Sequence, residues 1–189
     1  MFLTRRPSPE DIDRYLRESR DLPLSYAPVG IVGAPASRGV IDELTRVIGH
    51  GRADFERARD ALTAWTQFEI GWVETFPRPA PVAVGTDVAV LIRHLGFWSL
   101  NGCRVVYHLE PAGDRFGYAY GTLPNHAEAG EELFEVFLDS RTGDVMYRIR
   151  AISWPRALLA KVGQPIVRAL QARFRIDSAA AMVRAARGS

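Results

Sequence analysis

Residues 131–153 read EELFEVFLDSRTGDVMYRIRAIS and combine two alternating segments with a short polar link. Apolar residues occupy every second position of the later segment, at Val145, Tyr147, Ile149 and Ala151. That period of two is typical of a strand with one buried face. The link 139–144 contains Gly143, which suits the left-handed position of a hairpin built on a type I turn. We therefore predict a β-hairpin with arms 131–138 and 145–153.

The segments on either side extend this pattern. Alternation predicts further strands at 69–76, 86–95, 103–109 and 115–121. Residues 26–32 are another candidate strand, whereas 40–48 fits a helix or a strand. After Pro155, apolar residues recur three or four positions apart, at Leu159, Val162, Ile166, Leu170 and Phe174. This spacing predicts a long amphipathic helix that begins at Pro155 and is kinked near Gly163 and Pro165.

Two shorter helices are expected earlier in the chain. Ser8 and Pro9 suit the N-cap and the first turn of a helix that ends near Arg20. Residues 53–68 carry apolar side chains at helical spacing. Successive strands followed by one helix indicate an α+β fold, with a curved antiparallel β-sheet wrapped around the C-terminal helix. We expect an N-terminal helical appendage over 1–22 and a single domain over 23–189.

Net charge, apolar stretches and the cysteine count exclude some classes of function. The formal net charge of +2 is too small to indicate a nucleic-acid-binding protein by itself. The N-terminus has no apolar signal-peptide core, and no stretch is apolar enough for a transmembrane helix. A single cysteine, Cys103, excludes an intrachain disulfide and is expected to be buried and inert. These features predict a cytoplasmic protein with no cofactor.

Several motifs carry a family resemblance. They are Gly71–Glu74 (GWVE), Ser99–Tyr107 (SLNGCRVVY), Arg115–Pro124 (RFGYAYGTLP), His126, Gly130–Glu132 (GEE) and Arg150–Ser153 (RAIS). Over roughly residues 26–186 the chain resembles the uncharacterised-protein family 0548, a domain-of-unknown-function family of bacteria and plants. More remotely, the element order is similar to the helix-grip fold of START-type lipid-transfer domains and polyketide cyclases. This second resemblance implies an apolar cavity between sheet and helix, although residues 33–51 depart from the helix-grip pattern.

Three polar residues form the first candidate site. His126 lies five and six positions before Glu131 and Glu132. A histidine held by a carboxylate can act as a general base, and such residues can also bind a metal. The spacing matches no metal signature, so no metal is predicted. The alternative is a structural turn in which a glutamate pairs with Arg104 or Arg115.

Arginine and aromatic residues on the predicted strands form the second candidate site. Arg104, Arg115, Arg148 and Arg150 can clamp an anionic group, or they can lie on a solvated face paired with acidic residues. The aromatic residues can line an apolar pocket or fill the core. Among them we select a ligand-binding set of Arg104, Arg115, Trp72, Trp98, Tyr107, Tyr118 and Tyr120.

These observations leave three functions open. The first is binding of an apolar or amphipathic small molecule between the sheet and the C-terminal helix. The second is an enzyme that uses the same cavity, with His126 and Glu131 or Glu132 as acid–base groups. The third is an interaction or membrane-surface protein that uses the arginine-rich C-terminal helix.

Overall fold

The computed structural model describes residues 2–35, 38–109, 113–156 and 164–188, which form one antiparallel sheet with helices on both faces. The strand order is β2-β8-β7-β6-β5-β4-β3, and β1 pairs with β5. The strands are β1 (Phe2–Leu3), β2 (Val40–His50), β3 (Val73–Phe76), β4 (Asp87–His94), β5 (Phe97–His108), β6 (Arg115–Thr122), β7 (Glu128–Leu138) and β8 (Asp144–Pro155). The helices are α1 (Pro9–Ser19), α2 (Gly51–Thr63) and α4 (Gln164–Arg187), with 3₁₀ turns η1 (Ile31–Gly33) and η2 (Thr66–Phe68).

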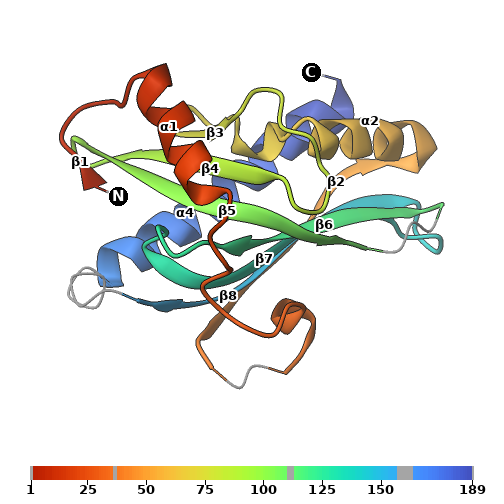
Figure 1. Cartoon of the computed structure of the whole chain (residues 1–189). Helices are drawn as coiled ribbons and strands as arrows, with labels where there is room; N and C mark the ends of the chain where they lie inside the picture. Colours follow the sequence, from red (N-terminus) through yellow and green to blue (C-terminus); the bar gives the residue numbers. More distant parts are fainter. Residues whose placement is uncertain (1, 36–37, 110–112, 157–163, 189) are drawn as a thin grey trace.

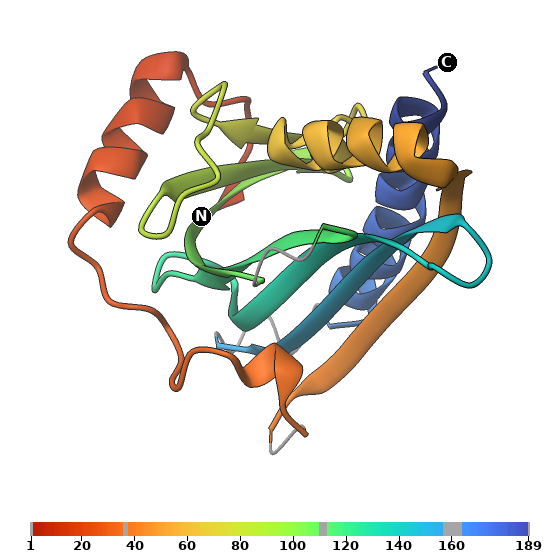
Figure 2. The same cartoon turned by 90° about the vertical axis from the view of Figure 1, so that its right-hand side faces the viewer.

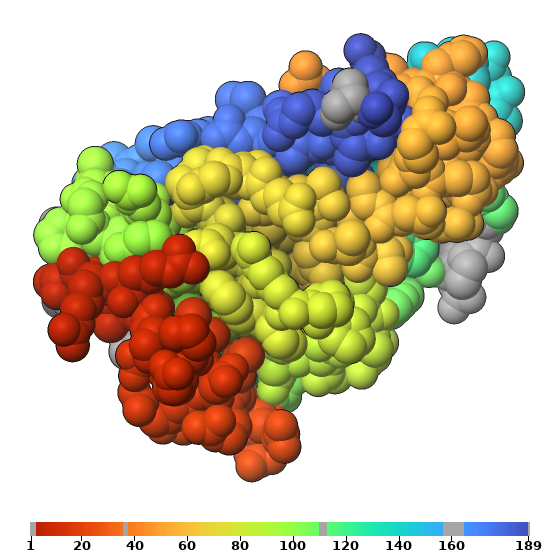
Figure 3. All heavy atoms as spheres, turned by 90° about the horizontal axis from the view of Figure 1, so that it is seen from above, coloured from red at the N-terminus to blue at the C-terminus, as the bar shows by residue number. Residues whose placement is uncertain are grey.

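The sheet curls, and α4 lies against its concave face with α2 beside it (Figures 1 and 2). Inward side chains of β4 to β8 form the main core with both helices, including Phe55, Leu62, Phe134, Tyr147 and Met182. The predicted curved antiparallel sheet around a C-terminal helix is therefore confirmed as a helix-grip fold. Seen from above, α4 and α1 occupy opposite sides of the molecule (Figure 3).

The N-terminal segment covers much of the convex face. Ile12 and Tyr15 of α1 pack on Leu91 and Leu100 of the β4–β5 hairpin. Farther along, Val32 packs on the outer side chains of β6, β7 and β8, namely Ala119, Leu133 and Ile152. Figure 2 shows this segment running from α1 around the sheet to β2. The division into an appendage at 1–22 and a domain at 23–189 stays a prediction.

Some element boundaries differ from those expected. Residues 26–32 form no strand, because the backbone N–H groups of Gly30 and Val32 donate to a glutamate side chain instead of a neighbouring strand. The ambiguous segment 40–48 is part of β2, which pairs with β8 along its length. Pro155 ends β8 and does not begin a helix. Leu159, Val162 and Gly163, with the expected kink, lie outside the described residues.

Candidate functional site

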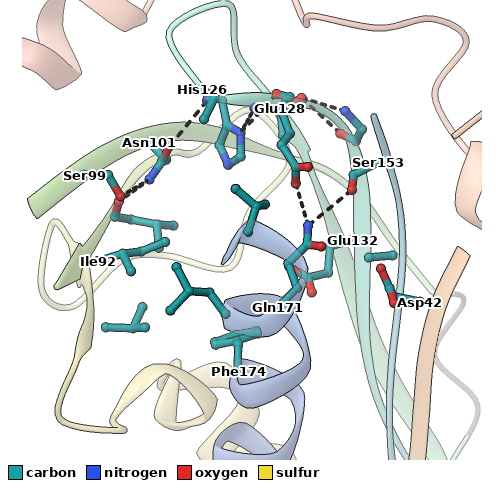
Figure 4. A pocket seen from close by; sticks show the side chains of 18 of the residues that line it. Asp42, Ile92, Ser99, Asn101, His126, Glu128, Glu132, Ser153, Gln171 and Phe174 are labelled. Atoms are coloured by element: carbon teal, nitrogen blue, oxygen red, sulfur yellow. Dashed lines mark hydrogen bonds between the residues drawn. The ribbon is translucent and has the colours of Figure 1, made fainter. Parts of the chain in front are cut away.

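A cavity of about 400 Å³ lies between the concave face of the sheet and the first turns of α4 (Figure 4). This volume is within the range of small-molecule sites in proteins. Its walls are mainly apolar and come from strands β2 to β8, from η2 and from α4. The principal apolar lining residues are Phe68, Trp72, Val90, Ile92, Leu170 and Phe174.

The pairing of β7 with β8 explains why the cavity lies at one end of the sheet. Toward the hairpin turn the inward pairs are bulky: Phe134 lies opposite Ile149, and Val136 opposite Tyr147. Toward the cavity the pairs become small or polar, with Glu132 opposite Ala151 and Gly130 opposite Ser153. Gly130 is required because a Cβ atom there would lie 2.0 Å from the carbonyl oxygen of Ile152. Large side chains therefore close one end of the sheet, and small ones leave space at the other.

One wall of the cavity carries a polar network (Figure 4). The amide of Gln171 on α4 donates to Glu128 at 2.5 Å and contacts the Ser153 hydroxyl at 3.3 Å. Arg168 donates to the Gln171 side-chain oxygen at 3.1 Å and to the buried Asp42 at 2.8 Å. The network joins β2, β7 and β8 to α4, and it fixes the helix against the sheet.

The carboxyl groups of Asp42 and Glu132 have different partners. The carboxylate of Asp42 contacts two cations, Arg168 and Arg175, the latter at 3.0 Å. Glu132 accepts a hydrogen bond from the Tyr120 hydroxyl and forms no ion pair among the described residues. Burial raises the pKa of Glu132 to about 7, although the hydrogen bond from Tyr120 acts in the opposite direction. Glu128 has a raised pKa for the same reason.

We expect Glu132→Gln to stabilise the protein in a pH-dependent way. Between the ordinary pKa of 4.5 and the folded-state pKa of about 7, the folded protein keeps a proton that the unfolded chain has lost. Wild-type stability therefore falls as pH rises through this window, whereas glutamine does not ionise. Above the window the variant should be more stable by on the order of 2 kcal/mol. Urea unfolding across the window measures this, and parallel stability curves for the two proteins would contradict it.

His126 lies in the loop between β6 and β7, and its ring points into the cavity (Figure 4). Its Nδ1 accepts a hydrogen bond from the backbone N–H of Glu128 at 2.9 Å. Burial lowers the pKa of His126 to about 4, so the ring is neutral at pH 7. Nδ1 also lies 3.0 Å from the carbonyl oxygen of Glu128, to which the other neutral tautomer donates. Nε2 can therefore donate a hydrogen bond in the tautomer that accepts at Nδ1, and it can accept one in the other tautomer.

The structure divides the predicted site residues between the two faces of the sheet. Trp72, Tyr120, His126 and Glu132 line the cavity. Tyr118 faces the same side but is fully buried in the core, where its hydroxyl accepts from Gln67 at 2.7 Å. The others form their side-chain contacts on the convex face: Arg104, Arg115, Tyr107, Trp98 and the carboxylate of Glu131.

The arginines on the convex face have structural partners. Arg104 binds Asp87 and donates to the carbonyl oxygen of Leu22 at 2.9 Å, which anchors the segment after α1. Arg115 and Arg148 both pair with the buried Glu135. The proposed anion clamp is therefore absent from the cavity, because these arginines alternate with the inward-facing residues of the same strands.

Sequence reasoning missed part of the polar wall. Asp42 was overlooked because its segment was ambiguous, and Glu128 because the predicted strand began at Glu131. One signal was available in Gln171, a polar residue beside Leu170 in the apolar stripe of the helix.

The predicted inert cysteine is also located. Cys103 is fully buried, and burial raises the pKa of its thiol well above the ordinary range. No group of three or more potential metal-ligating residues occurs within the described ranges. No helix in those ranges is long and apolar enough to cross a membrane.

Comparisons with solved structures support the fold alone. The protein TTHA0849 from Thermus thermophilus has a TM-score of 0.51 at 9% identity, covering 79% of this chain and 98% of that protein. Hypothetical protein jhp0584 from Helicobacter pylori has a TM-score of 0.50 at 12% identity, covering 77% and 86%. Both similarities agree with the observed architecture, and neither assigns a function.

Sequence comparisons establish the family. A UPF0548 protein of Dictyostelium discoideum is 32% identical over 206 residues, covering 98% of this chain and 95% of that protein. A UPF0548 protein of Deinococcus radiodurans is 33% identical over 199 residues, covering 98% and 99%. The family model described as domain of unknown function (DUF1990) matches residues 25–181. The chain therefore belongs to the DUF1990 family, as the resemblance to uncharacterised-protein family 0548 predicted.

Proposed function

We propose that this protein binds an amphipathic small molecule in the cavity between the sheet and α4. The main support for the proposal is the cavity of about 400 Å³, which remains between the sheet and α4 although the helix covers the sheet. Burial of an apolar ligand body against Trp72, Ile92 and Phe174 supplies affinity at about 25 cal/mol per Å² of apolar surface. A hydrogen-bond donor on the ligand suits the carboxyl groups of Glu128 and Glu132.

The acid–base alternative has less support. Its two candidate carboxylates lie on opposite faces, because Glu131 bonds to the Tyr26 hydroxyl on the convex side. His126 and Glu132 share the cavity, but within the described residues no hydrogen bond joins them. Catalysis by His126 with Glu131 or Glu132 stays a prediction, and binding is the function that we favour.

The test is native mass spectrometry of the full chain as purified, followed by solvent extraction. We expect a stoichiometric extra mass that extracts as an amphipathic molecule. Protein stripped of that mass should bind the neutral apolar probe N-phenyl-1-naphthylamine at a single saturable site. If the stripped protein neither binds the probe nor recovers a bound mass from a lipid extract, the proposal is wrong.

A further inference from the structure

Three exposed apolar side chains surround one end of the cavity. Leu95 and Phe97, at the tip of the β4–β5 hairpin, are 72% and 50% exposed, and Ile166 in the first turn of α4 is 48% exposed. All three also line the cavity, so they form its rim. The hairpin tip and the start of α4 lie at the same end of the molecule (Figures 1 and 3). We call these three residues the apolar rim.

The turn between β4 and β5 contains a residue that is unfavourable for stability. His94 pairs with Phe97, which leaves Leu95 and Gly96 as a two-residue turn with φ of 48° and 80°. Such turns favour asparagine, aspartate or glycine at both positions, because the left-handed conformation crowds a Cβ atom. Leucine carries that steric cost, and at 72% exposure it gains little from packing. A bulky apolar residue at this position therefore indicates a role outside the isolated fold.

The charge around the apolar rim indicates what it contacts. Residues 88–109, which form most of the hairpin, contain no aspartate or glutamate. Arg93, two positions before the tip residue Leu95, stacks over Trp98 with its Cζ 5.9 Å from the ring centroid. Within the described residues no acidic side chain pairs with Arg93, whereas Arg6 on the same ring pairs with Glu74. An exposed apolar tip flanked by unpaired positive charge is complementary to an anionic bilayer surface.

We propose that the apolar rim docks on an anionic lipid bilayer, with Leu95 and Phe97 inserted at the boundary between headgroups and acyl chains. An apolar ligand then passes between bilayer and cavity without exposing its surface to water. This inference rests on the proposed ligand binding and adds where the ligand enters. It also places the membrane contact at the hairpin and the start of α4, instead of along the arginine-rich face of the helix.

Vesicle cosedimentation of the full chain tests the inference. Vesicles of phosphatidylcholine alone are compared with vesicles that also contain phosphatidylserine. We expect the wild type to bind the anionic vesicles and to be released by salt. Leu95→Asn should weaken binding about tenfold, because it removes one inserted leucine. Asparagine suits the left-handed turn, so this variant should fold at least as stably as the wild type.

The matched control is Ile176→Asn, which removes an apolar side chain with 57% exposure from α4 away from the cavity lining. It should bind vesicles like the wild type. Absence of wild-type binding, or equal binding by Leu95→Asn, would overturn the inference. Self-association that Leu95→Asn abolishes, without vesicle binding, would identify a protein contact and also overturn it. Probe binding without vesicles is measured in parallel: its loss in every protein would instead contradict the proposed ligand binding.

Discussion

Replacing Glu131 with alanine is expected to lower the free energy of unfolding by about 3 kcal/mol, since a buried charged acceptor with several donors is lost. Glu131 is 2% exposed and receives hydrogen bonds from four groups. They are the hydroxyls of Tyr26 (2.6 Å) and Tyr107 (3.1 Å) and the backbone N–H groups of Gly30 (2.8 Å) and Val32 (3.2 Å). In the alanine variant these donors lose their shared acceptor, and the segment before β2 loses its main polar attachment to the sheet.

Urea unfolding of the full chain measures the effect. Tyr107→Phe is the matched control, because it removes one of the four hydrogen bonds and should cost about 1 kcal/mol. Glu131→Gln should be intermediate, since its amide keeps one acceptor oxygen but turns an NH₂ group toward the donors. Should Glu131→Ala be no less stable than Tyr107→Phe, the carboxylate would not be the attachment point that the geometry indicates.

The same residue shows where sequence reasoning reached its limit. A period of two correctly predicted the strands around residues 131–153, and that period already places Glu131 and Glu132 on opposite faces. Grouping both with His126 relied on closeness in sequence instead of on side-chain direction. The partner of Glu131 lies 105 residues away at Tyr26, in a segment without regular secondary structure. No local pattern encodes such a contact.

The cavity was implied by the fold resemblance, but its lining required the strand register. Ala151 looks like an ordinary small strand residue until β8 is paired with β7, where it lies opposite Glu132. Tyr120 and Tyr107 both belong to the predicted aromatic set, yet only Tyr120 faces inward. The register shift between Val105 and Tyr107 shows how an irregularity can change the face that a residue occupies. The strands β3 to β8 were therefore predictable, whereas the structure of segments 26–32 and 40–48 and the membership of the site depended on tertiary contacts.

Ala151→Trp is expected to reduce binding of N-phenyl-1-naphthylamine at least about a hundredfold, because the indole occupies the volume that the ligand needs. Ala151 lines the cavity from β8, on the same face as the core residues Tyr147 and Ile149. Overpacking a filled core costs about 1–3 kcal/mol, but here the added ring enters open space, so the fold should survive. A titration followed by probe fluorescence measures the loss, and thermal unfolding verifies the fold.

Ala169→Trp supplies the matched control, since Ala169 is an exposed residue of α4 outside the cavity lining. It adds the same ring to the surface and should leave probe affinity unchanged. If Ala151→Trp folds and still binds the probe like Ala169→Trp, the ligand occupies another place, and the cavity is not the binding site. If only Ala151→Trp loses the probe while the anionic-vesicle binding of both variants persists, binding to the bilayer and filling of the cavity are separable steps. That separation is expected, because the apolar rim contacts the bilayer through side chains at the mouth, whereas Ala151 lies on the wall of the cavity.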